Sequence, residues 1–297
     1  MIYTLTLNPA IDYVLEVDPL TWGGTNRARA GRISFGGKGI NVSTVLAHLG
    51  LKSVALGFIA GFTGDALEQD VDRRGILTDF VRLPQGDTRI NVKLKGEAET
   101  ELNAPGPAVT ARDMETLYQK LERLAGGDTL ILSGSLPPSL PPTVYADILA
   151  RWSGRGVRFV VDAAGALLTN TLPHRPFLIK PNRSELEELC GQRLDTDDEL
   201  TRAARALQTQ GARNVLVSLG PEGALLLDEG GQLHRRAAYP GKAVNTVGAG
   251  DAMVAGFLAG FEKGYDAALT LAVAAGCATA FSPDLATAAE IQALYQG

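Results

Sequence analysis

Short apolar segments alternate with helical segments through the second half of the chain, and this alternation is the strongest constraint on the fold. Four of the apolar segments are predicted to be strands, at residues 129–132, 158–161, 177–179 and 214–218. Such alternation is typical of a parallel sheet with helices on both faces. We therefore predict an α/β fold built on a doubly wound, mostly parallel sheet.

Each of these strands ends in a polar or turn-forming stretch. The four stretches begin at Ser133, Asp162, Lys180 and Ser218. Ligands of open α/β sheets bind at the carboxyl ends of the strands, so we expect these turns to line a single cleft. Two further strands are predicted near the N-terminus, at residues 2–7 and 53–59.

Residues 245–257 read Asn-Thr-Val-Gly-Ala-Gly-Asp-Ala-Met-Val-Ala-Gly-Phe, a glycine-rich turn that runs into an apolar helix. Unpaired backbone amides and the helix dipole favour an anion at such a helix start. Asp251 in the first helical turn could simply be a helix cap. A cap does not explain the small residues before it, which leave room for a second anion. We favour a general base, with the amides of Gly248, Ala249 and Gly250 stabilising a phosphoryl group.

The same turn matches neither of the common nucleotide-binding signatures. It lacks the Gly-x-x-x-x-Gly-Lys-Ser/Thr of a P-loop, and Met253 stands where the dinucleotide fingerprint needs its third glycine. The missing fingerprint argues against an oxidoreductase with this architecture.

A second glycine-rich stretch opens a predicted helix that ends near Gly50. Gly37 brings the backbone close to a ligand, while Lys38 and Asn41 supply a cation and an amide for a polyol or a phosphate. His48 lies further along this helix and is predicted to be structural. Asp12, just past the first strand, is either a turn residue or a substrate contact.

Four short strands are expected between the α/β units, in segments of about 11–35 and 88–104. We predict that they form a small β-sheet lid, which would exclude water during phosphoryl transfer. Lysines such as Lys93 ordinarily mark a solvated sheet edge, whereas the planar fork of Arg89 suits a phosphate. The other, apolar face of the lid would be exposed, which predicts a homodimer formed through the lids.

Asn182 and Glu185 lie three residues apart at a predicted helix start. This spacing suits a reciprocal capping arrangement, and it equally suits a pair that orders water on Mg²⁺. The spacing leaves both interpretations open.

Length and charge narrow the remaining classes of protein. A chain of 297 residues with a net charge of −5 and no Lys/Arg run fits one α/β domain over residues 1–297 and argues against a nucleic-acid partner. The sequence shows no signal peptide or membrane span, so we expect a cytoplasmic protein. Cys190 and Cys277 are expected to be buried free thiols, and three scattered histidines argue against structural zinc.

With these motifs in hand, the chain resembles the PfkB branch of the ribokinase-like sugar kinases over nearly its full length. Two stretches carry the resemblance, Gly-Gly-Lys-Gly-Ile-Asn-Val at 36–42 and Asn-Thr-Val-Gly-Ala-Gly-Asp at 245–251. Residues 88–94, 133–137 and 180–185 are most similar to bacterial kinases of fructose 1-phosphate. The resemblance implies a ribokinase-like fold and phosphorylation of fructose 1-phosphate at its 6-hydroxyl, with ATP and Mg²⁺.

The resemblance also implies roles for individual residues. Asp251 would be the general base, and residues 248–250 would form the anion hole. The sugar phosphate would be held by Asp12, Gly37, Lys38, Asn41 and Arg89, with Lys93 and Ser135 as further contacts. The ATP site would comprise Lys180, Asn182, Ser218, Gly220, Gly223, Thr246, Gly248 and Gly250, and Glu185 would reach Mg²⁺ through water.

Two alternatives stay open at this point. A kinase of tagatose 6-phosphate or fructose 6-phosphate would differ only in where the substrate phosphate lies. A sugar-phosphate sensor would bind without catalysis, but a sensor needs no base, and Asp251 beside its anion hole therefore argues against one.

Overall fold

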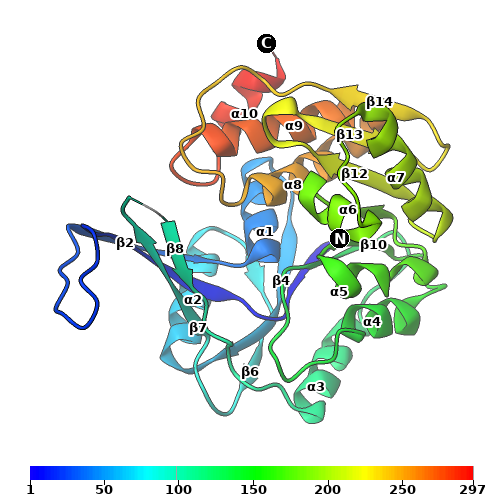
Figure 1. The fold of residues 1–297 in the computed structure, drawn as a ribbon. Helices are drawn as coiled ribbons and strands as arrows, with labels where there is room; N and C mark the ends of the chain where they lie inside the picture. The colour runs from blue at the N-terminus through cyan, green and yellow to red at the C-terminus, as the bar shows by residue number, and fades with distance from the viewer. Residues whose placement is uncertain (98, 297) are drawn as a thin grey trace.

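The computed structural model describes residues 1–97 and 99–296, so Ala98, inside the second predicted lid segment, and Gly297 lie outside the described residues. Its larger sheet has ten strands in the order β14-β13-β12-β11-β10-β9-β1-β4-β5, with β6 paired to β4 (Figure 1). The strands are β1 (Ile2–Thr6), β4 (Ser53–Ala60), β5 (Leu77–Thr78), β6 (Val81–Leu83), β9 (Thr129–Ser133), β10 (Arg158–Asp162), β11 (Leu178–Ile179), β12 (Asn214–Ser218), β13 (Ala224–Leu227) and β14 (Leu233–Arg236).

The pairing of these strands confirms the predicted doubly wound, mostly parallel sheet. All neighbouring pairs from β12 to β5 are parallel, as is β4–β6. The β13–β14 hairpin continues the sheet beyond β12 with antiparallel pairs. The chain builds β4 on one side of β1 and later β9 on the other. The strand order therefore reverses at β1, and a ligand crevice is expected beyond its carboxyl end.

Helices cover both faces of the larger sheet. One face carries α3 (Ala111–Leu121), α4 (Val144–Trp152), α5 (Gly165–Thr169), α6 (Arg183–Cys190) and α7 (Asp197–Thr209), whose buried side chains join a single core cluster. The opposite face carries α1 (Lys38–His48), α2 (Gly61–Arg73), α8 (Ala249–Gly260), α9 (Tyr265–Phe281) and α10 (Ala288–Tyr295). Figure 1 shows α8 and α9 side by side above α1.

Helix α8 is apolar on nearly all sides, as a helix enclosed by protein must be. Ala252, Val254 and Phe257 are fully buried, and α8 packs along α9 and against α1. Because close-packed interiors allow little movement, the N-terminus of α8 is fixed relative to the sheet. This packing gives Asp251, in the first turn of α8, a defined position.

A separate sheet of four strands, called the small sheet below, stands to one side of the larger one (Figure 1). Its order is β3-β2-β7-β8, with β2 (Ala10–Glu16), β3 (Ala30–Gly36), β7 (Arg89–Lys95) and β8 (Glu99–Leu102). Its strands fall in the two segments predicted for the lid. The β2–β7 pair is parallel, and the other two pairs are antiparallel.

The two faces of the small sheet have opposite character. Register places the polar side chains of β2 and β7 on one face, where Asn91 and Lys93 are buried. The other face leaves Ile33 and Ile90 exposed. The interpretation of Lys93 as a solvated edge residue is therefore wrong, because β7 is an inner strand between β2 and β8 and its polar face turns toward the body of the protein.

Other sequence predictions meet mixed outcomes. Both cysteines are free thiols, but Cys190 is exposed near the end of α6, so the prediction that it is buried is wrong. His48 is structural as predicted, since its Nδ1 lies 2.7 Å from the Ala286 carbonyl oxygen. Among the helices of residues 1–97 and 99–296, none is long and apolar enough to cross a membrane.

Candidate active site

The turns after the parallel strands meet the small sheet and the starts of α1 and α8 around one cavity of about 410 Å³. Most of the predicted site residues line it: Asp12, Gly37, Lys38, Asn41, Arg89, Lys180, Asn182, Glu185, Ser218, Gly248, Gly250 and Asp251. Asn91 and Asp162 line it as well. The cavity lies where a doubly wound sheet binds its ligands, at the carboxyl ends of its strands.

Asp251 is buried at the mouth of α8, with only 5% of its surface exposed. The Asn41 side-chain amide donates a hydrogen bond to its Oδ2 at 2.8 Å. Burial, together with the nearby Asp162 carboxylate, raises the pKa of Asp251 to about 6, against the opposing effects of the Asn41 hydrogen bond and two lysines. A carboxylate with this pKa is ionised at neutral pH yet basic enough to accept a proton from a hydroxyl.

The turn before Asp251 depends on a residue without a side chain. Gly248 has φ 80°, and a Cβ there would lie 2.5 Å from the Leu285 Cδ2. The helical hydrogen bonds of α8 begin at the Ala252 amide, which donates to the Gly248 carbonyl, so the amides of Gly250 and Asp251 remain for an anion. The Ala249 amide donates to the Thr246 carbonyl at 3.3 Å, so the turn itself occupies one amide of the predicted anion hole.

Two lysines meet one buried carboxylate beside this helix start. Asp162, the last residue of β10, is fully buried, and its Oδ1 lies 3.3 Å from the Lys38 Nζ and 3.4 Å from the Lys180 Nζ. Burial alone would raise the pKa of Asp162, but Lys180 and Lys38 outweigh it and lower that pKa. Asp162 offsets only one of the two ammonium charges, and Asp251, when it is ionised, faces the same two lysines.

The small sheet contributes a held carboxylate and a free cation. Asn91 Nδ2 donates to Asp12 Oδ1 at 2.9 Å, and Lys93 Nζ lies 3.1 Å from the other Asp12 oxygen and 3.4 Å from Glu101. Arg89 has no carboxylate partner: it donates to the Ser135 hydroxyl at 3.4 Å, and its buried Nε has no acceptor among the described residues. Lys93 is thus neutralised, while Arg89 is available to an anion.

Asn182 and Glu185 form a capping box at the start of α6. The Asn182 side chain accepts from the Glu185 amide, and the Glu185 carboxylate accepts from the Asn182 amide, each at 2.8 Å. The other Glu185 oxygen has no hydrogen-bond partner among the described residues, and both residues line the cavity, so the cap leaves a carboxylate oxygen available there. No group of three or more His, Cys, Asp or Glu residues in the described part of the chain could hold a metal ion.

Three predicted nucleotide-site residues lie outside the cavity lining. Gly220 and Gly223 belong to the turn between β12 and β13, and Thr246 is exposed before α8. Gly223 has a packing reason to be glycine, since a Cβ there would lie 2.1 Å from the Arg236 carbonyl oxygen. Gly220 and Gly223 follow Ser218 in the chain, and Thr246 precedes Gly248. All three are therefore close in sequence to residues of the cavity wall without lining it themselves.

A profile of the pfkB family of carbohydrate kinases matches residues 4–291. The chain belongs to the pfkB carbohydrate kinase family. It is therefore a phosphotransferase, and its architecture is the ribokinase-like α/β fold that the motifs predicted.

Relatives of this carbohydrate kinase include enzymes and a solved structure. It is 41% identical over 301 residues to the 1-phosphofructokinase of Bacillus subtilis, covering 99% of this chain and 97% of that protein. It is 37% identical over 288 residues to the D-tagatose-1-phosphate kinase of Bacillus licheniformis, covering 96% and 94%. A crystal structure of a putative phosphofructokinase from Staphylococcus aureus matches with a TM-score of 0.87 and 42% identity, covering 100% and 97%.

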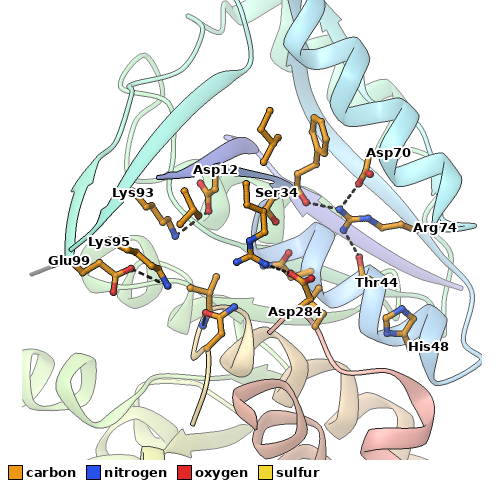
Figure 2. Close-up of a pocket in the computed structure, with 18 residues that line it drawn as sticks. Asp12, Ser34, Thr44, His48, Asp70, Arg74, Lys93, Lys95, Glu99 and Asp284 are labelled. Atoms are coloured by element: carbon orange, nitrogen blue, oxygen red, sulfur yellow. Dashed lines mark hydrogen bonds and ion pairs between the residues drawn. The ribbon is translucent and has the colours of Figure 1, made fainter. Parts of the chain in front are cut away.

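A second cavity of about 420 Å³ adjoins the first one and lies under the polar face of the small sheet (Figure 2). It shares Asp12 and Asn41 with the first cavity. On its far side Arg32 of β3 donates to Asp284 at 2.8 Å, joining the small sheet to the loop before α10. Figure 2 shows Arg32's partner Asp284, and Arg74 between Asp70 and Thr44. These cations are already paired, unlike Arg89.

Two residues of the cavity lining, Asp162 and Asn91, were not predicted as site residues. The sequence indicated only that Asp162 is polar and follows a strand. The signal for Asp162 was its place after a parallel strand, where ligand-binding residues gather. The signal for Asn91 was its alternation with Arg89 and Lys93, which puts all three on one face of β7.

Proposed function

We propose that this kinase is a 1-phosphofructokinase, which transfers the γ-phosphoryl group of ATP to the 6-hydroxyl of fructose 1-phosphate. One observation carries the proposal: a buried base and an unpaired arginine line the same cavity. Asp251 stands at the start of α8, and Arg89 forms no ion pair with a carboxylate among the described residues. A substrate with a reactive hydroxyl and its own phosphate has a partner for each group.

In the proposed reaction, Asp251 accepts the proton of the 6-hydroxyl as the substrate oxygen forms a bond to the γ-phosphorus. The bond from that phosphorus to the β–γ bridging oxygen breaks, and ADP leaves with the electron pair. The amides of Gly250 and Asp251 and the ammonium groups of Lys38 and Lys180 face the charge on the phosphoryl oxygens. Asn41 holds Asp251 in place through its 2.8 Å hydrogen bond.

The sugar would be oriented by Asp12, Gly37 and Asn41. Asp12 suits hydroxyl groups because Asn91 and Lys93 fix both its oxygens. Gly37, at φ 141°, lets the backbone approach, since a Cβ there would lie 2.7 Å from the Thr6 methyl group. Ser135 supports Arg89 at the substrate phosphate. Lys93 acts through Asp12 in this proposal rather than by touching the phosphate.

ATP would lie along the ends of β11 and β12, near Lys180, Asn182, Ser218, Gly220, Gly223 and Thr246. Magnesium supplied with the nucleotide would offset phosphate charge, and the free oxygen of Glu185 fits an outer contact to its bound water. Because ATP is abundant in the cytoplasm and the two thiols are free, we place the enzyme there.

The small sheet would act as a lid over one catalytic domain, with its exposed apolar face covered by a second copy. Ile33, Ile90 and Leu102 are 56%, 41% and 59% exposed. Such a patch on an enzyme supports a homodimer formed through the small sheets.

A second candidate substrate is tagatose 1-phosphate, favoured by the 37% identity to a D-tagatose-1-phosphate kinase. Tagatose 6-phosphate and fructose 6-phosphate carry their phosphate on the opposite end of the sugar from fructose 1-phosphate. The test is an ADP-release assay with Mg-ATP that compares kcat/KM for all four sugar phosphates. We expect fructose 1-phosphate to be preferred at least about tenfold, a discrimination of about 1.4 kcal/mol. Preference for another sugar phosphate would contradict the substrate assignment, and turnover on none would favour a sensor.

A further inference from the structure

The Asp162 carboxylate is satisfied on one oxygen and unsatisfied on the other. Both lysine ammonium groups lie against its Oδ1, at 3.3 and 3.4 Å. Its Oδ2 is buried and has no hydrogen-bond partner among the described residues. A group held only to stabilise the fold would normally have both oxygens bonded, because a buried unsatisfied acceptor destabilises the folded state.

The two lysines reach Asp162 from different elements of the fold. Lys38 begins α1 and its side chain is 39% exposed, whereas Lys180 follows β11 and its side chain is 5% exposed. The Lys180 Nζ lies only 3.1 Å from where a Cβ on Gly250 would stand, so it borders the anion-binding start of α8. Without a shared anion, two such cations would repel each other, and the more exposed Lys38 would turn toward solvent.

We infer that Asp162 is a positioning residue of the phosphoryl-transfer site, which holds the Lys38 and Lys180 ammonium groups beside the mouth of α8 before the nucleotide arrives. This inference rests on the proposed kinase mechanism. Among the described residues, the Asp162 carboxylate forms ion pairs with these two lysines only. It acts on catalysis through them, because preorganised cations need no rearrangement when charge develops on the transferred group.

A second effect follows from the same geometry. The charged groups that face Asp251 are Asp162 from β10, Lys38 from α1 and Lys180 from the turn after β11, and Asn41 is its hydrogen-bond donor. Asp162 raises the pKa of Asp251, while the lysines lower it. Loss of the Asp162 charge therefore leaves Asp251 a weaker base that stays ionised to lower pH.

The test is Asp162→Asn in the full-length enzyme, assayed with Mg-ATP and the preferred sugar phosphate. We expect kcat to fall on the order of 100-fold with KM for the sugar phosphate within about threefold, and the acid limb of the kcat/KM profile to move to lower pH. The control is Asp79→Asn, since Asp79 also serves two cations, Lys120 and Arg123, away from the cavity. We expect that control to keep both kcat and the acid limb.

A second pair of variants covers the case in which Asp162→Asn does not fold. Lys38→Met with Asp162→Asn removes one charge of each sign. Its acid limb should lie below that of Lys38→Met alone, and its kcat should be within about tenfold of that single variant. The inference would be overturned if Asp162→Asn changed neither kcat nor the acid limb of the kcat/KM profile. It would also be overturned if adding Asp162→Asn to Lys38→Met lowered kcat by a further 100-fold. A wild-type enzyme inactive on every sugar phosphate would instead refute the proposed function.

Discussion

Two charge clusters in this kinase, each centred on a buried side chain, have opposite composition. At Asp162 one carboxylate serves two ammonium groups, and one of its oxygens is left without a partner. At His234 one imidazole serves two carboxylates, with Nε2 at 2.8 Å from Asp228 and Nδ1 at 2.6 Å from Asp266. The first cluster leaves one carboxylate oxygen without a partner, and the second uses both of its ring nitrogens.

This difference in hydrogen bonding distinguishes a candidate ligand site from a cluster that stabilises the fold. The His234 cluster joins the β13–β14 hairpin to the start of α9, where Asp266 lies, and it lies outside the ligand cavity. Only the imidazolium form can donate to both carboxylates, so this cluster is complete without a ligand. The Asp162 cluster keeps one carboxylate oxygen without a partner among the described residues, and it lines the ligand cavity. Of these two clusters, the one with an unsatisfied buried oxygen lines the ligand cavity, and the satisfied one belongs to the frame around it.

The largest expected effect is at Asp251, the proposed base beside the Asp162 cluster. Asp251→Asn keeps the size and shape of the side chain and its ability to form hydrogen bonds, but it removes the carboxylate that could accept a proton. We expect kcat to fall by about 10²–10⁴ while sugar-phosphate binding stays close to that of the wild type. Steady-state kinetics and a direct binding titration measure the two quantities. Turnover near the wild-type rate would remove Asp251 from the mechanism.

Wild-type activity should also depend on the ionisation of Asp251. Since its pKa is raised to about 6, kcat/KM should fall as the pH drops through that value.

Arg89 sharpens the comparison within a single strand. Arg89 is unpaired and Lys93 is held between Asp12 and Glu101, although both project from the same face of β7. We expect Arg89→Ala to raise KM for the sugar phosphate by about 10- to 100-fold with a smaller change in kcat, because a charge-assisted contact to phosphate is lost. Arg82→Ala is the matched control, since Arg82 is exposed and paired with Asp65 and Glu68. An unchanged KM in Arg89→Ala would exclude the phosphate contact.

The sequence allowed prediction of the sheet, the helix starts and the place of Asp251 in the cavity wall. Alternating segments indicate parallel strands, and the glycine-rich turn before Asp251 marks an anion site from local chemistry alone. Which charges neutralise each other depends on side chains far apart in the chain. Asp162 and Lys38 are 124 residues apart, and Asp12 and Lys93 lie on different strands. Polarity alone therefore assigned Lys93 to a solvated edge or to phosphate, whereas pairing decides its role.

The exposed state of Cys190 was equally beyond local reasoning. A helical pattern around a cysteine predicts burial because free thiols are usually buried. Cys190 ends α6 just before Gly191, whose φ of 66° turns the chain away. Whether a side chain at a helix end is buried depends on which other elements pack against it, and the neighbouring residues in the sequence do not predict that packing.

The smallest expected effect is at the satisfied cluster, and it should appear in stability rather than in turnover. The two carboxylates outweigh the burial that would lower the pKa of His234, so that pKa is raised above 6.5 in the folded protein. The stabilisation should be fully present below pH 6.5 and be lost as the pH rises through the raised value. His234→Gln should cost about 1–3 kcal/mol near neutral pH and flatten this dependence, with kcat unchanged. Thermal unfolding of both proteins between pH 6 and 9 measures the effect. A Tm difference between the wild type and His234→Gln that stays the same across that range would show that His234 is not charged. A loss of kcat in the variant would show that the His234 cluster contributes to the active site and not only to stability.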